Sequence, residues 1–86
     1  MKVFISADME GLATTSIHED CNPIYPQYLY HCEEMTKEVV AACEGAIAAG
    51  ADEILIKDAH GPASNIDPKA LPECCKIIRK WSGHPY

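Results

Sequence analysis

A long helical segment stands between two short β-type runs, and this order limits the possible folds more than any other feature of the chain. Residues 2–5 and 53–57 are short, apolar and rich in β-branched side chains, as is typical of buried strands. Between them, residues 28–49 carry apolar side chains at helical spacing, and Gly50 is placed to end the helix. The inward face is expected to comprise Cys32, Met35, Val39, Ala42, Cys43, Ala46 and Ala49. The pattern predicts a βαβ unit with parallel strands.

The last third of the chain predicts one further strand. Asp67 followed by Pro68 is typical of an N-cap and first helical position, and Pro72 limits that helix to about one turn. Residues 73–80 are expected to form a third strand and residues 81–86 a loop. The fold class is therefore α/β, with a βαβ unit and a three-stranded, mostly parallel sheet. One helix leaves one sheet face uncovered, so residues 1–86 are expected to be the N-terminal, incomplete part of a larger α/β domain.

Polar side chains follow both of the first two predicted strands. Asp8 and Glu10 come after the first, Asp58 and His60 come after the second, and a glycine follows each pair. Side chains two apart in extended chain point the same way, and parallel neighbours end at one edge of the sheet. That edge is where α/β sheets bind ligands, and carboxylates with imidazole suit zinc, manganese or a similar ion. The sequence predicts a divalent-metal site, with a basic partner or plain exposed turn residues as the alternatives.

Charge and hydropathy exclude other classes. The net charge of −6 argues against nucleic-acid binding, and the one basic cluster, Lys76, Arg79 and Lys80, is expected to be a solvated face. No apolar run approaches the roughly 20 residues of a membrane span, so no membrane partner is expected. The N-terminus does not have the pattern of a signal peptide, which predicts a cytoplasmic protein.

The cysteines and the long loop carry weaker signals. The five cysteines show no C-x-x-C spacing. Cys32 and Cys43 are expected to be reduced core residues, whereas Cys21, in a loop rich in proline and asparagine, is the one thiol that could be exposed. Residues 12–26 predict a solvated loop, with residues 18–20 (His-Glu-Asp) as an alternative source of a substrate contact or further ligand.

Ser6-Ala7-Asp8-Met9-Glu10-Gly11, followed about fifty residues later by Asp58-Ala59-His60, carries a family resemblance. With Met35-Thr36-Lys37-Glu38 in the helix, these motifs resemble the N-terminal portion of the DppA-type D-aminopeptidases, the M55 family of zinc metallopeptidases. The resemblance covers essentially the whole chain.

The resemblance implies a partial active site. Asp8, Glu10 and His60 would be zinc ligands, Asp8 would bridge two zinc ions, and Asp58 would orient His60 or support its loop. Further ligands and the catalytic groups are expected beyond residue 86. The implied reaction is hydrolysis of short peptides with an N-terminal D-amino acid, of the D-alanine type, by a metal-activated water in a homo-oligomer. The alternatives are a non-catalytic α/β fragment that binds a divalent metal or a partner, and another metal hydrolase such as a phosphoesterase. The phosphoesterase is disfavoured because the loops carry no glycine-rich or arginine-rich phosphate cradle.

Overall fold

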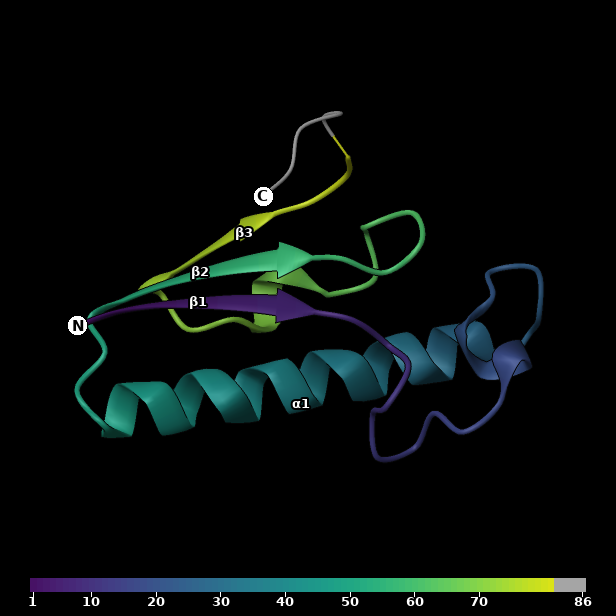
Figure 1. Cartoon of the computed structure of the whole chain (residues 1–86), viewed down its shortest axis with the longest axis horizontal. Helices are drawn as coiled ribbons and strands as arrows, with labels where there is room; N and C mark the ends of the chain where they lie inside the picture. The colour runs from purple at the N-terminus through teal and green to yellow at the C-terminus, as the bar shows by residue number, and fades with distance from the viewer. Residues whose placement is uncertain (82–86) are drawn as a thin grey trace.

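The computed structural model describes residues 1–81, so most of the loop expected over residues 81–86 lies outside the described part. Its strands are β1 (Lys2–Ala7), β2 (Glu53–Asp58) and β3 (Cys75–Ile78), and its long helix is α1 (Tyr28–Ala48). Two short 3-10 helices, η1 (His18–Cys21) and η2 (Pro68–Ala70), interrupt the loops. The sheet order is β1-β2-β3, and both strand pairs are parallel (Figure 1). The predicted α/β fold is confirmed.

The strand register sets the position of the candidate site. β1 pairs with β2 from Lys2 opposite Glu53 to Ala7 opposite Asp58, so the two strands end level with each other. In Figure 1 all three strands point the same way, and the long loop after β1 lies beyond their carboxyl ends. β3 is shorter than predicted, because Cys75 closes a turn onto the Pro72 carbonyl and Lys80 has a positive φ of 67°.

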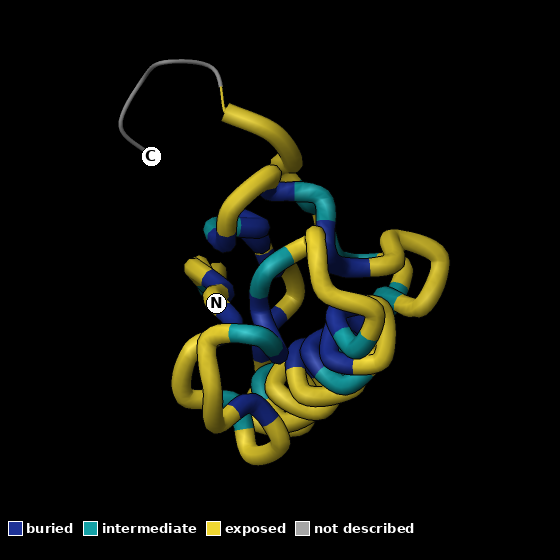
Figure 2. The backbone as a smooth tube through the Cα atoms, turned by 90° about the vertical axis from the view of Figure 1, so that its right-hand side faces the viewer, coloured by how far each residue is buried: buried dark blue, intermediate teal, exposed yellow. Residues whose placement is uncertain are grey.

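The helix α1 packs on one face of the sheet, and buried segments lie between the two layers (Figure 2). Met35 and Cys43 are fully buried there, and Ile54 and Ile56 of β2 supply the facing side chains. Cys32 and Val39 are also buried, so these four predicted helix positions are confirmed. This shared core holds β1 and β2 at a fixed distance from the helix.

The inward face of α1 differs from the prediction at both ends. Ala42 and Ala49 are exposed, whereas His31 and Thr36 are buried. Loops cover the first half of the helix: the buried His31 lies under the loop after β1, and Thr36 accepts a hydrogen bond from the Asp67 N–H at 3.1 Å. Helical periodicity alone does not show which loops fold back onto a helix.

The helix ends as predicted at Gly50, whose φ of +106° suits glycine. The Gly50 N–H donates to the Ile47 carbonyl at 3.0 Å and the Ala51 N–H to the Ala46 carbonyl at 2.9 Å. This pair of bonds is the Schellman arrangement, and it satisfies carbonyls that the helix leaves open. The chain then enters β2 three residues after Gly50.

The sheet face opposite α1 is open, as the sequence predicted. Phe4, Leu55 and Ile78 are 50%, 37% and 44% exposed. A shallow hollow of about 360 Å³ on this side includes Phe4 and Leu55, with Lys2 and Lys76 among the residues at its rim. Among residues 1–81, no helix has both the length and the apolar character needed to cross a bilayer.

Candidate metal centre

Three of the predicted site residues meet at the carboxyl edge of β1 and β2. Oδ1 of Asp8 lies 2.9 Å from Nδ1 of His60, and Oε1 of Glu10 lies 3.0 Å from the same nitrogen. The imidazole is nearly buried, whereas the two carboxylates are 59% and 65% exposed. Residues fifty or more apart in the chain thus bring two carboxylate oxygens close to one imidazole nitrogen. Their role as metal ligands stays a prediction.

The backbone after β1 explains why both carboxylates reach His60. The Ala59 N–H donates to the Ala7 carbonyl at 2.8 Å, which carries the strand pairing one residue past β2. The Met9 N–H donates to Oδ1 of Asp8 at 2.8 Å and holds that carboxylate in place. Gly11, with φ at +97°, then lets the chain turn sharply away.

The orientation of His60 comes from the far side of its ring. Nε2 lies 2.6 Å from the Cys21 carbonyl oxygen. A carbonyl only accepts hydrogen bonds, so Nε2 carries a proton and Nδ1 faces the carboxylates. Metal-bound histidines are commonly oriented in this way, by a carbonyl on the nitrogen that does not bind the metal.

The surroundings of His60 and Asp8 shift the pKa values of both side chains. Burial acts to lower the pKa of His60, but the Cys21 carbonyl, the Asp8 hydrogen bond and the charge of Glu10 together raise it above the ordinary value. Partial burial acts to raise the pKa of Asp8, but the Met9 N–H and His60 hydrogen bonds lower it overall. The contact between the two side chains therefore favours an ionised Asp8 carboxylate beside a protonated His60 imidazole.

Asp58 does not join this cluster, and its expected place was beside the ligands and not among them. It is fully buried, and Oδ2 accepts from the N–H groups of Asn65 and Ile66 at 2.6 and 2.9 Å. Oδ1 accepts from Nδ2 of Asn65 at 2.8 Å, and the same amide donates to the His60 carbonyl at 2.7 Å. Asp58 thus hydrogen-bonds the loop that follows His60, and its role for the site stays a prediction.

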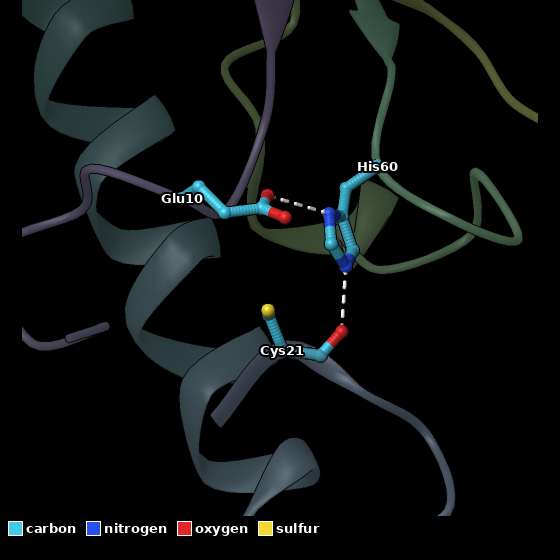
Figure 3. Close-up of side chains that lie close together, drawn as sticks. All are labelled: Glu10, Cys21 and His60. Carbon is cyan, nitrogen blue, oxygen red and sulfur yellow. Dashed lines mark hydrogen bonds and ion pairs between the residues drawn. The ribbon is translucent and has the colours of Figure 1, made fainter. Parts of the chain in front are cut away.

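Cys21 belongs to the cluster, although by sequence it was the one thiol that could be exposed. It is only 5% exposed, because η1 turns it inward and its thiol donates to the His18 carbonyl at 3.3 Å. Its Sγ, a carboxylate oxygen of Glu10 and a ring nitrogen of His60 all lie within 4.8 Å of one another (Figure 3). Burial, and then the charge of Glu10, raise the pKa of the Cys21 thiol. No motif in the sequence marks this residue.

The loop that carries Cys21 is anchored to α1, so the prediction of a solvated loop is wrong for Asp20. Oδ2 of Asp20 accepts from the N–H groups of Ser16 and Ile17 at 3.1 and 3.3 Å, and Oδ1 lies 3.2 Å from Nε2 of His31. The hydrogen bond from Ser16 is the largest influence on Asp20, and its pKa lies below the ordinary value. Asp20 therefore holds η1 in place against α1.

A cavity of about 330 Å³ opens beside the cluster. It is lined by Glu10, Gly11, Thr15, Ser16, Ile17, His18 and Cys21. His18 thus borders the space next to the cluster. A substrate contact or a further metal ligand were the two functional roles that the sequence offered for residues 18–20. The cavity gives small molecules a way to approach Glu10 and Cys21.

A carboxylate–imidazole cluster at the carboxyl edge of a parallel sheet defines an α/β protein with a candidate divalent-metal site, since these donors fit zinc and similar ions. The comparisons with known proteins are more specific. The family model Peptidase M55, described as D-aminopeptidase, matches residues 1–86. The chain belongs to this family, as its motifs indicated.

A solved structure shares the fold. The protein described as "Zn-dependent D-aminopeptidase DppA from Bacillus subtilis, a self-compartmentalizing protease" superposes with a TM-score of 0.90 at 24% sequence identity. The match covers 95% of this chain and 30% of the other, so this chain spans under a third of that protein's length. A comparison with curated proteins gave no match.

Proposed function

We propose that this chain supplies Asp8, Glu10 and His60 to the zinc centre of a D-aminopeptidase. The observation that carries the proposal is the convergence of both carboxylates on Nδ1 of His60, at 2.9 and 3.0 Å. Family membership supports it, and the structural neighbour is named as zinc-dependent. The three residues form part of a site, and the further ligands and catalytic groups are proposed to lie beyond residue 86.

The proposed substrate is a short peptide with a free N-terminal D-amino acid, of the D-alanine type. Zinc, when bound, activates a water molecule and polarises the scissile carbonyl. The complete site is proposed to hold two zinc ions, with Asp8 as the bridging ligand. The Asp8 side chain is 59% exposed, and this accessibility to metal ions supports the role.

Residues of this chain prepare the site for that chemistry. The Cys21 carbonyl keeps the Nε2 proton of His60 in place, so that Nδ1 is the nitrogen turned toward the carboxylates. Asp58 holds the backbone after His60 through Asn65 and Ile66. The cavity beside Glu10 leaves room for a small substrate to approach.

The assembly is part of the proposal. The neighbour is described as self-compartmentalizing, which supports a homo-oligomer for the complete protein. A cytoplasmic location stays a prediction.

Zinc binding tests the proposed ligands. Isothermal titration of the 86-residue chain is expected to show zinc binding that falls at least about 100-fold in His60→Ala, more than the loss of an outer partner typically costs. His18→Ala is the matched control, because this exposed histidine borders the same cavity but lies outside the cluster. Equal zinc affinity in His60→Ala and in the unaltered chain contradicts the proposal.

Activity tests the reaction. A chain extended to the family's length is expected to hydrolyse a D-alanine dipeptide faster than the L-alanine dipeptide, and Asp8→Ala is expected to abolish that hydrolysis. Metal binding without hydrolysis of either dipeptide favours the alternative, a non-catalytic metal-binding α/β protein. Full activity in Asp8→Ala overturns the assignment of Asp8 as a ligand.

A further inference from the structure

The thiol of Cys21 occupies a position that the three predicted ligands do not explain. It lies within 4.8 Å of both Glu10 and His60, and it comes from a different segment, the end of η1. Figure 3 shows the thiol directed toward the Glu10 carboxylate, beside the imidazole ring. One buried thiol, one carboxylate and one imidazole thus surround a common space, and Cys21 and Glu10 also line the cavity beside it.

The spacing is close to what a single ion requires. Zinc binds thiolate at about 2.3 Å and nitrogen or oxygen at about 2.0–2.2 Å, so tetrahedral ligand atoms lie roughly 3.3–3.6 Å apart. Atoms already within 4.8 Å of one another need to approach by about 1.2–1.5 Å at most to meet that geometry. Rotation about χ1 of Cys21 and χ angles of the exposed Glu10 provides movement on this scale.

The position of Cys21 is held by the fold, so the proximity is not a property of a loose loop. Asp20 binds two backbone N–H groups before η1 and pairs with the buried His31 of α1. The carbonyl of Cys21 itself meets Nε2 of His60. The same residue therefore orients the imidazole through its backbone and presents a soft donor through its side chain.

We propose that Cys21 is an additional protein ligand of the metal centre, beside Glu10 and His60. This inference rests on the proposed function and adds a thiolate to its donor set. On binding, the S–H bond of Cys21 breaks, a sulfur–metal bond forms and the proton passes to solvent, with no change of oxidation state. Thiolate ligands favour zinc over harder ions such as magnesium or manganese, so the residue tunes the centre toward zinc.

Cobalt(II) is the probe, since it binds in zinc sites and its absorption spectrum reports which ligands it has. The 86-residue chain, kept reduced with a phosphine, is titrated with cobalt while the near-ultraviolet thiolate-to-cobalt charge-transfer band and the visible d–d bands are recorded. The unaltered chain is expected to show both. Cys21→Ser and Cys21→Val are expected to lose the charge-transfer band and at least about tenfold in affinity. Cys43→Ala is the matched control, because Cys43 is a buried free thiol in the core, and it is expected to keep the band.

The outcomes separate this inference from the function on which it rests. Cobalt binding that depends on His60 but shows no charge-transfer band, or a band that persists in Cys21→Ser, overturns the role of Cys21 and leaves the proposed function standing. A band that depends on Cys21 but survives in His60→Ala overturns both, because the thiolate then binds metal outside the proposed centre. Failure of a chain extended to the family's length to bind cobalt also overturns both, because the proposed further ligands are then present.

Discussion

Replacing Asp58 with alanine is expected to destabilise the whole chain. The carboxylate is fully buried and accepts three hydrogen bonds, from two backbone N–H groups and one side-chain amide. Alanine leaves all three donors without this partner, and each buried donor left unsatisfied costs about 1–3 kcal/mol. Taking the lower end for each donor gives a loss of about 3 kcal/mol in the free energy of unfolding. That is a large share of the roughly 5–15 kcal/mol by which small domains are stable.

Urea unfolding measures this loss, with two optical signals. Far-ultraviolet circular dichroism follows the global transition. Fluorescence of Trp81, the one tryptophan of the sequence, follows the loop after His60, because its indole N–H donates to the Gly61 carbonyl at 2.6 Å. Asp58→Asn keeps the shape of the side chain and one oxygen, so it is expected to lose less than Asp58→Ala.

The control is Glu73→Ala, which removes an exposed carboxylate and is expected to leave the free energy of unfolding within error of the unaltered chain. If Asp58→Ala is as stable as Glu73→Ala, the hydrogen bonds of Asp58 do not hold the loop and the argument fails.

Three further predictions concern the core and the helix. Met35→Ala is expected to lower the free energy of unfolding by about 2–5 kcal/mol, because a fully buried side chain leaves a cavity; a urea midpoint unchanged from that of the unaltered chain contradicts this. Gly50→Ala is expected to cost about 1–2 kcal/mol through its positive φ, and thermal unfolding without a drop in Tm contradicts it. Burial, then hydrogen bonding to Cys32, raises the pKa of Tyr28, so folding favours its neutral phenol. This contribution to the free energy of unfolding is complete below the ordinary pKa of 10.0 and is lost as the pH rises above it. Urea unfolding at increasing pH is therefore expected to show a steeper alkaline loss of stability in the unaltered chain than in Tyr28→Phe. Equal losses of stability in the two chains refute this prediction.

The convergence of Asp8, Glu10 and His60 was predictable because it depends on two local rules. Side chains alternate along extended chain, and neighbouring parallel strands end at one edge. The level register of Ala7 and Asp58 then brings the residues that follow each strand together. The same locality explains why Gly50 was correctly predicted to end the helix: one glycine with a positive φ satisfies the requirement.

The rest of the site could be described only from the tertiary structure. It depends on the way in which the long loops fold back onto the sheet edge and the helix. The sequence shows that Asp58 lies near His60, but only the path of Asn65 and Ile66 makes it a support for the loop. A cysteine in a polar loop looks exposed until Asp20 and His31 fix η1 against the helix.

The sequence by itself determined the βαβ order, the helix end and the edge at which the predicted ligands meet, since each follows from periodicity and a few backbone-restricted residues. The tertiary structure decided which further side chains surround them. Cys21 reaches Glu10 and His60 only because the chain between Gly11 and α1 turns back onto the carboxyl edge of the sheet. No periodic pattern in the sequence predicts this path of the loop. It is held by hydrogen bonds between residues far apart in the chain, such as the one from His60 to the Cys21 carbonyl.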